Sequence, residues 1–356
     1  MTRAGGAAAL GGLMLAAALT FGASTLYVPA VALLLLAVVA VVWVALAAAG
    51  ASLDRRGGPH SVEEEHPWPL TLEWRRGVVR PPGGELVEPL LERPLPVGGR
   101  TARRVRVEVR FERRGRRTLE SPRLVLRDPL GLARRELTAP AIELIVLPRV
   151  EPVLAPGGGG GGVIGRMAHP LAASAEVEPD ALRPYRPGTP AARIHWPSVA
   201  RTGEVLERRL VADADALPLV VLDPRRPPTE DALDRALRAA ASLCVHLARA
   251  GGCVLMLPGD RRASEIDPHL HAWPPLHIRL ALVEADDRAP VPGRVERSGA
   301  LFWVAAGAGT PPPGLARAAA AERYLVTPVP TGPVAASFVV AGCAGRPIGR
   351  QSRVAA

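Results

Sequence analysis

The amino end of the chain is its most strongly apolar part, since no Asp, Glu, Lys, Arg or His occurs between Arg3 and Asp54. A bilayer core about 30 Å thick is crossed by about 20 helical residues, so this stretch is too long for one span and long enough for two. Pro29 marks the turn between them. The pattern predicts a transmembrane hairpin over residues 1–53, with helices at about 4–21 and 29–49.

The flanking cations predict the orientation of this hairpin. Arg3 and the amino terminus precede the first span, Arg55 and Arg56 follow the second, and the connecting loop carries no charge. By the positive-inside rule we expect a multi-pass protein of the cell membrane, with both termini and the soluble domains in the cytoplasm. A cleaved signal peptide ending near Ala23 is the alternative, and the second span would still anchor that product.

Within the predicted domain at residues 54–155, the hydrophobic period is two from about Trp68 to Pro148. Valines alternate with charged residues between Arg104 and Phe111, as in a strand with one wet face. Residues 124–126 and 142–147 form two more apolar runs, and Asp128-Pro129-Leu130-Gly131 is a turn sequence. These features predict a small antiparallel β-sandwich that serves as a structural or interaction module.

Six consecutive glycines follow at positions 157–162. A phosphate-binding loop needs glycines at defined spacing before a helix, with a lysine in one version, and neither feature is present here. We therefore expect residues 156–169 to be a flexible linker.

Composition narrows the classes of partner. The net charge is +10 and all 44 basic residues are arginine, which indicates a compositional bias of the whole sequence rather than one selected surface. Aromatic residues make up only 4% of the chain, so nucleic-acid binding is not expected, and anionic lipid headgroups are the better match for the charge. The three cysteines, Cys244, Cys253 and Cys343, are too few and too scattered for a disulfide framework or a zinc site.

The densest unusual chemistry lies between residues 182 and 203, around the turn at Pro187-Gly188. Guanidinium groups can stack on aromatic rings and can bind carboxylates in a bidentate fork. Two roles stay open: the arginines either tie this segment to acidic groups of the same chain or dock a protein partner. The candidate residues are Arg183, Tyr185, Arg186, Gly188, Arg193, His195, Trp196 and Arg201.

The remaining sequence alternates between apolar runs and helical periods. A buried strand is expected at 217–223, then a helix capped by Thr229 and closed by Gly251 and Gly252. Further strands are expected at 253–257, 301–305, 324–327 and 336–340, with helices at 270–284 and 315–323. This alternation predicts a parallel, doubly wound α/β sheet within residues 170–356.

The arginine-aromatic segment resembles the signature of the domain-of-unknown-function 58 family. The matching residues are Leu182, Arg183, Tyr185, Pro187, Gly188, Arg193, Ile194, Trp196, Ala200, Arg201 and Gly203, and the Asp128-Pro129-Leu130-Gly131 turn is similar to a second family motif. Thr189 and Pro197 depart from the pattern, which usually has Asp and a basic or polar residue there. The resemblance implies a von Willebrand factor A-like α/β domain and a scaffold role beside a MoxR-type AAA ATPase.

In the von Willebrand factor A fold, a metal site requires an Asp-x-Ser-x-Ser loop after the first strand, because a hard cation takes oxygen ligands. This chain has Asp223-Pro224-Arg225-Arg226-Pro227 at that place. We expect no metal or other cofactor, and we expect Asp223 to pair with Arg225, Arg226 or an arginine of the 183–201 segment.

Two other functions remain as alternatives. One is a hydrolase that uses His195 with an acid such as Asp223, although no common catalytic motif accompanies them. The other is a basic structural protein bound to the envelope or to lipid. The favoured prediction is a non-enzymatic scaffold with no small-molecule substrate.

Overall fold

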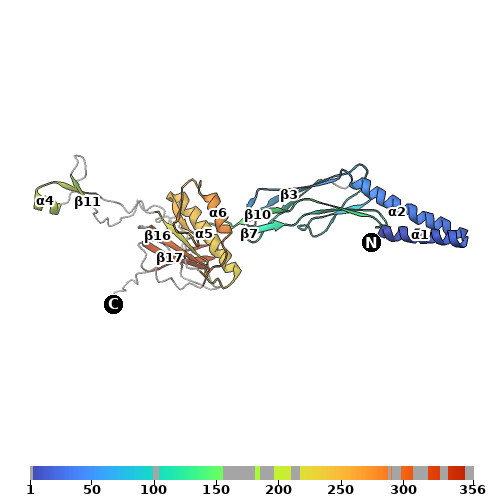
Figure 1. The fold of residues 1–356 in the computed structure, drawn as a ribbon. Coiled ribbons are helices and arrows are strands. Elements are labelled where there is room, and N and C mark those ends of the chain that lie inside the picture. Colours follow the sequence, from blue (N-terminus) through green and yellow to red (C-terminus); the bar gives the residue numbers. More distant parts are fainter. Residues whose placement is uncertain are drawn as a thin grey trace. The chain divides into compact units, whose positions relative to one another are not determined.

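The computed structural model describes residues 3–98, 104–154, 181–184, 196–209, 217–287, 290, 298–307, 320–328 and 336–348 (Figure 1). The chain divides into two compact units, Met1–Val146 and Leu147–Ala356. The expected glycine linker at 156–169 lies outside the described residues.

The first unit begins with two apolar helices, α1 (Arg3–Phe21) and α2 (Tyr27–Ala48), joined through a short 3-10 helix at Ser24–Leu26. Both are long and apolar enough to cross a membrane, and their bounds lie within two residues of those expected. They pack closely through small residues, because a Cβ added to Gly11 would lie only 3.0 Å from the Ala30 carbonyl oxygen. The predicted helical hairpin is therefore confirmed as a structure.

The rest of the first unit is built of short antiparallel strands. They form three sheets with the orders β1-β3-β6, β2-β10-β7 and β5-β4-β8-β9. The antiparallel prediction is confirmed for the described strands. The predicted sandwich stays a prediction, and hydrophobic side chains of β3 pack against residues of both other sheets. The strands are β1 Ser52–Gly57, β2 Ser61–Glu63, β3 Trp68–Arg75, β4 Gly84–Val87, β5 Leu95–Pro96, β6 Arg104–Val109, β7 Gly115–Leu119, β8 Arg123–Arg127, β9 Arg134–Thr138 and β10 Ile142–Leu147.

Strand β3 links two hydrophobic cores, because alternate residues of a strand share one face. Trp68 and Leu70 belong to the core that also contains Val62, Leu119, Leu144 and Val146. Leu72 and Trp74 belong to a second core, which contains three residues of α2, namely Ala40, Val44 and Ala47. The carboxyl end of α2 is thus part of the β-domain itself.

Arg55 is buried, although the sequence suggested a cation flanking the second span. Its Nη2 donates to Glu88 Oε1 at 2.8 Å, and its Nη1 donates to the Glu120 carbonyl oxygen at 2.7 Å. Burial lowers the pKa of Arg55 and raises the pKa of Glu88. Of the two arginines that flank the second span, only Arg56 lies at the surface, where it pairs with Asp54.

The second unit is built on a seven-stranded sheet with the order β15-β14-β13-β16-β17-β19-β18. Strands β14, β13, β16 and β17 are parallel, whereas β15 and β19 run antiparallel to the strands beside them. The sheet is therefore mixed, and the prediction of an all-parallel sheet is wrong at both edges. The strands are β13 Leu219–Asp223, β14 Cys253–Met256, β15 Ser264–Ile266, β16 Ser298–Ala305, β17 Ala320–Pro328, β18 Phe338–Val340 and β19 Cys343–Pro347.

Helix α5 (Glu230–Gly251) follows the sequence prediction closely. The Thr229 hydroxyl accepts a hydrogen bond from the Ala232 amide at 3.1 Å, and Gly252, with a φ of 105°, ends the helix. Its buried face packs on β13, β14, β16 and β17 in the main core.

Two helix predictions need correction. Helix α6 covers only Trp273–Ala281 of the expected 270–284. Residues Ala320–Pro328 form strand β17, so the helix expected at 315–323 is wrong at its carboxyl end, and residues 315–319 lie outside the described part. Alanine favours a helix locally, but pairing with β16 overrides that preference.

Residues 147–154 belong to the second unit rather than to the β-domain that was expected to reach residue 155. The Leu154 amide donates to the Val339 carbonyl oxygen at 2.8 Å, and Val339 returns the bond at 2.7 Å. This segment therefore covers the edge of β18, where unpaired backbone groups would otherwise be exposed.

Candidate functional site: the carboxyl edge of the seven-stranded sheet

The order of the strands identifies one edge of the sheet as the candidate site. Of the seven strands in this sheet, β13 comes first in the sequence, and it lies between β14 and β16. The chain thus continues to one side of β13 and later to the other, which makes a topological switch point. In open α/β sheets, ligands bind outside the carboxyl ends of the strands at such a point. Here those ends are Asp223 of β13 and Ala305 of β16.

Asp223 lies at this switch point and is only 4% exposed. Its Oδ1 accepts a hydrogen bond from Arg225 Nε at 2.8 Å, and its Oδ2 accepts one from Arg225 Nη2 at 2.7 Å. Trp303 Nε1 on β16 also donates to Oδ2, at 3.1 Å. The hydrogen bonds that Arg225 donates to Asp223 raise the pKa of Arg225. Arg225, one of the partners that the sequence left open, therefore pairs with Asp223.

The backbone holds this arrangement in place. The Ala306 amide donates to the Asp223 carbonyl oxygen at 2.9 Å. A Cβ added to Gly307 would lie 2.7 Å from the Arg225 carbonyl oxygen, so the turn and the end of β16 can approach this closely only at a glycine. Arg226 in this turn has a φ of 44°, in the left-handed region. The loop after β13 is therefore fixed against β16.

These contacts define what the carboxylate can do. Both oxygens of Asp223 already accept hydrogen bonds, and the guanidinium of Arg225 supplies the positive charge beside it. A divalent cation or a transferred proton would have to displace Arg225 first. Among the residues that the structure describes, no group of three or more His, Cys, Asp and Glu side chains is arranged to hold a metal ion.

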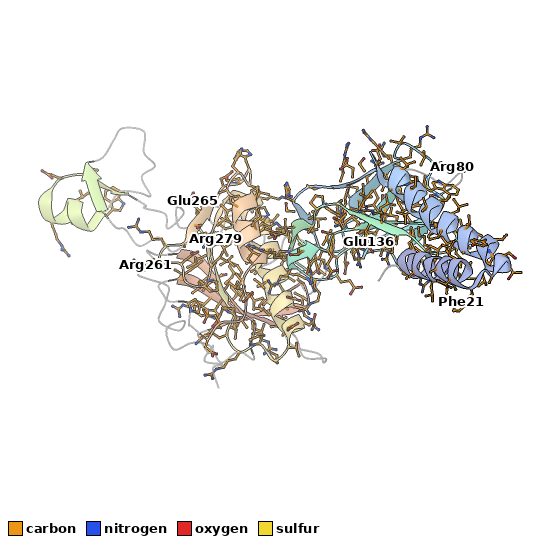
Figure 2. All side chains as sticks on the ribbon, turned by 45° about the vertical axis from the view of Figure 1, so that its right-hand side comes forward. Phe21, Arg80, Glu136, Arg261, Glu265 and Arg279 are labelled. Atoms are coloured by element: carbon orange, nitrogen blue, oxygen red, sulfur yellow. The ribbon has the colours of Figure 1, made fainter. Side chains whose placement is uncertain are left out.

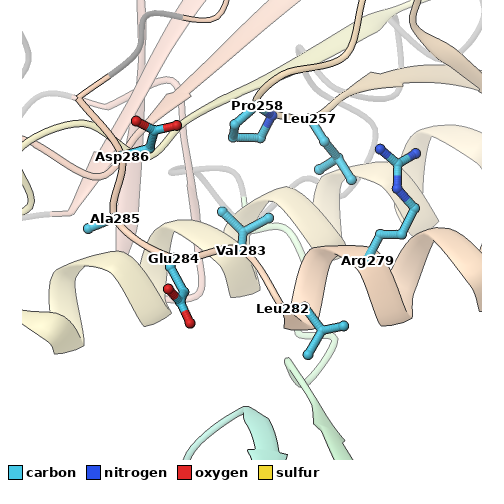
Figure 3. A pocket seen from close by; sticks show the side chains of 8 residues that line it. All are labelled: Leu257, Pro258, Arg279, Leu282, Val283, Glu284, Ala285 and Asp286. Carbon is cyan, nitrogen blue, oxygen red and sulfur yellow. The ribbon is translucent and has the colours of Figure 1, made fainter.

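A shallow hollow of about 370 Å³ opens at the same edge (Figure 3). Val221 pairs with Met256, the last residue of β14, so Leu257 and Pro258 follow the carboxyl end of the strand beside β13. The Arg279 side chain lines this hollow and donates to Asp260 Oδ1 at 2.5 Å. The lining residues are Leu257, Pro258, Arg279, Leu282, Val283, Glu284, Ala285 and Asp286. The sequence offered no motif for the hollow, because its lining comes from two separate segments, the residues after β14 and the carboxyl end of α6 with the residues that follow it.

The arginine-aromatic segment is described only in part. Arg183 lies in β11 (Ala181–Pro184) opposite Glu207 of β12 (Leu206–Arg209), with which β11 forms a two-stranded antiparallel sheet. Trp196 begins helix α4 (Trp196–Thr202), which contacts β12. The Trp196 side chain is 61% exposed, and Arg201 in the last turn is exposed as well. Tyr185, Arg186, Gly188, Arg193 and His195 lie outside the described residues.

The three cysteines are free and lie buried in the main core of the second unit. Burial raises the pKa of Cys244 and raises the pKa of Cys343 to about 12, so neither thiol ionises near neutral pH. A loop before α6 contains a contact that sequence reasoning missed. There Asp267 accepts from the ring of His271, and this hydrogen bond lowers the pKa of Asp267 to about 2.

Comparison of the chain with protein-family models, with curated proteins and with solved structures gives no match. The resemblance to the domain-of-unknown-function 58 family therefore depends on the motif residues alone.

Proposed function

We propose that this chain is a membrane-anchored, non-enzymatic scaffold whose cytoplasmic α/β domain docks a MoxR-type AAA ATPase. The two apolar helices support the anchor, since each is long enough to cross a bilayer. The resemblance of the 182–203 segment to the domain-of-unknown-function 58 family suggests that the partner is a MoxR-type ATPase.

The von Willebrand factor A-like fold is part of this proposal. A first strand in the interior of the sheet, between β14 and β16, and an antiparallel strand at the sheet's edge support that assignment. At the switch point, Arg225 supplies the positive charge beside Asp223. We therefore assign this edge a structural role, because its charged groups are already engaged with each other.

The observation that carries the docking role is the exposure of Trp196 at the start of α4. An exposed Trp is costly to leave in water, and Trp and Arg are the residue types most enriched at the energetic centres of protein interfaces. Arg201 is exposed on the same short helix. A helix that exposes both residues is suited to a protein partner.

The test is capture of the ATPase by the full chain in lipid nanodiscs, with a nucleotide analogue that traps the ATPase on its partners. Trp196→Ala and Arg201→Ala should each weaken capture at least tenfold, the effect of losing about 1.4 kcal/mol. Arg249→Ala is the matched control, because Arg249 is also an exposed arginine in the last turn of a helix. Capture that is unchanged in both variants, or lost equally in the control, contradicts the docking role of α4.

The cytoplasmic orientation needs its own test. Of two reporter domains fused after Ala356, the one that works only in the cytoplasm should be active, and the one that works only outside the cell should be inactive. A reporter that is active only outside the cell contradicts the proposed topology and with it the access of a cytoplasmic ATPase.

A further inference from the structure

The β-domain is attached to the helical hairpin without a flexible joint. Ala40, Val44 and Ala47 of α2 are buried in the same core as Leu72 and Trp74. Any membrane that surrounds the hairpin must therefore meet a fixed face of this domain. Two loops of the domain lie at that face, one between β3 and β4 and the other between β8 and β9.

The first loop, residues 76–80, runs along the end of α2. The Val78 amide donates to the Ala49 carbonyl oxygen at 2.9 Å, and Trp43 Nε1 donates to the Arg80 carbonyl oxygen at 3.1 Å. A Cβ added to Gly77 would lie 2.3 Å from the Ala47 carbonyl oxygen, so only glycine permits this close approach. Arg80 is labelled beside α2 in Figure 2.

The second loop is the turn at Asp128–Ala133, whose Asp-Pro-Leu-Gly sequence was recognised as a motif. The Asp128 carboxylate accepts hydrogen bonds from the Leu130 amide at 2.9 Å and from the Ala133 amide at 2.6 Å. Gly131 has a φ of 67°, as the tight turn requires. The Leu132 carbonyl oxygen accepts from the Ala4 amide at 3.0 Å, which fixes the turn to the start of α1.

Each loop exposes one large apolar side chain to solvent. Val78 is 76% exposed and Leu130 is 60% exposed. Within the described part of the β-domain, residues 51–98 and 104–146, these two are the only large hydrophobic side chains that are strongly exposed. The hydrogen bonds around them show that the exposure results from well-defined loop structure.

The depth of the loops follows from their contacts with the helices. Trp43 lies six residues before Ala49, about 9 Å along the axis of α2, so the first loop extends back along the last turns of this helix. At this level Val42 and Leu46 of α2 are still exposed. Trp side chains are enriched at the membrane–water interface. The loops and the apolar surface of α2 therefore overlap at the depth of the lipid headgroups.

The charge around the loops is positive. Five exposed arginines border them, and none of the five forms an ion pair with another described residue. Arginine binds phosphate oxygens in a bidentate fork, and basic residues near a membrane are attracted by anionic headgroups. The five are Arg3, Arg76, Arg80, Arg127 and Arg135.

We infer that these two loops form a lipid-binding seat, in which Val78 and Leu130 enter the headgroup layer and the arginines contact lipid phosphates. This inference rests on the proposed membrane anchor and adds a second contact that fixes the angle of the β-domain to the bilayer. The hairpin alone would hold the chain in the membrane, whereas the seat would keep the β-domain from tilting.

The test places an environment-sensitive fluorophore on single cysteines in the full chain, in nanodiscs of phosphatidylcholine with or without phosphatidylglycerol. The three native cysteines are buried, so we expect the reagent not to label them in the folded protein. Labels replace Val78 and Leu130, with exposed Glu112 in the β6–β7 turn as the water control and exposed Leu35 in the middle of α2 as the membrane control. Nitroxide groups on the lipid headgroup or mid-chain quench according to depth.

The fluorophores at 78 and 130 should emit at shorter wavelength than at 112 and should be quenched by headgroup nitroxide, more strongly with phosphatidylglycerol at low salt. The fluorophore at 35 should be quenched by mid-chain nitroxide. If 35 is quenched and 78 and 130 behave like 112, the seat is wrong and the anchor stands. If 35 is not quenched, the anchor fails and the seat fails with it. A blue shift without lipid quenching that grows with protein concentration assigns the loops to a second copy and also overturns the inference.

Discussion

Replacing Arg225 by alanine removes the charge beside the buried Asp223. The substitution deletes the two charged hydrogen bonds at 2.8 and 2.7 Å and leaves the carboxylate with the Trp303 indole and the Arg225 backbone amide, whose nitrogen lies at 3.2 Å. Each hydrogen bond to a charged group contributes about 1.5–3 kcal/mol, and breaking a buried ion pair costs about 3–5 kcal/mol. The Arg225 side chain is 31% exposed, so water can enter and replace part of the loss.

We therefore expect Arg225→Ala to lower the free energy of unfolding of the second unit by about 2–3 kcal/mol. For a unit of this size that corresponds to a fall in Tm of about 4–12 °C. The assay is thermal unfolding of the full chain in nanodiscs, with hydrogen exchange of peptides from β13 and β16 to assign the transition. Exchange should rise first at the Ala306 amide, which donates to the Asp223 carbonyl oxygen.

Arg226→Ala is the matched control, because Arg226 is adjacent and exposed and makes no hydrogen bond to Asp223. Its φ of 44° strains alanine and arginine alike, so the control should melt close to the wild type. Equal melting of Arg225→Ala and Arg226→Ala would refute the argument that the ion pair stabilises the switch point.

Three further predictions concern other buried features. Arg55→Met should destabilise the first unit by about 3–5 kcal/mol, because it leaves Glu88 buried without a counter-charge. Adding Glu88→Leu to this variant should restore most of the lost stability. Equal melting temperatures for the single and the double variant would contradict this prediction. Gly77→Val should cost about 1–3 kcal/mol, since its Cβ would lie 2.3 Å from the Ala47 carbonyl oxygen, and chemical denaturation of the full chain measures this cost. Burial raises the pKa of Cys343 to about 12, so a thiol reagent at pH 8 should modify it only at the rate of unfolding, and rapid modification of the folded chain refutes its burial.

Local sequence patterns determined the elements that are stabilised locally. The two apolar helices lie where a run without charges requires them, and α5 begins at Thr229 because that side chain caps it. The Asp223–Arg225 ion pair could be predicted from the sequence because the two residues lie two positions apart in the chain. In each case the residues that decide the structure are close together in the sequence.

Features that depend on distant contacts were missed. The alanines at the start of β17 favour a helix by themselves, and only pairing with β16 makes them a strand. The burial of Arg55 depends on Glu88 and on the carbonyl groups that end β7. The exposure of Val78 and Leu130 has no periodic signal in the sequence, because both residues lie in loops rather than in a helix or strand.

The central claim is that this chain holds an AAA ATPase through α4. The most direct measurement places a photo-crosslinking amino acid at position 196 of the full chain in cells and identifies the adduct by mass spectrometry. The account predicts an adduct with a subunit of a MoxR-type ATPase, and no such adduct from the same amino acid at position 249. Adducts at position 196 that contain only this chain or only lipid would contradict the claim.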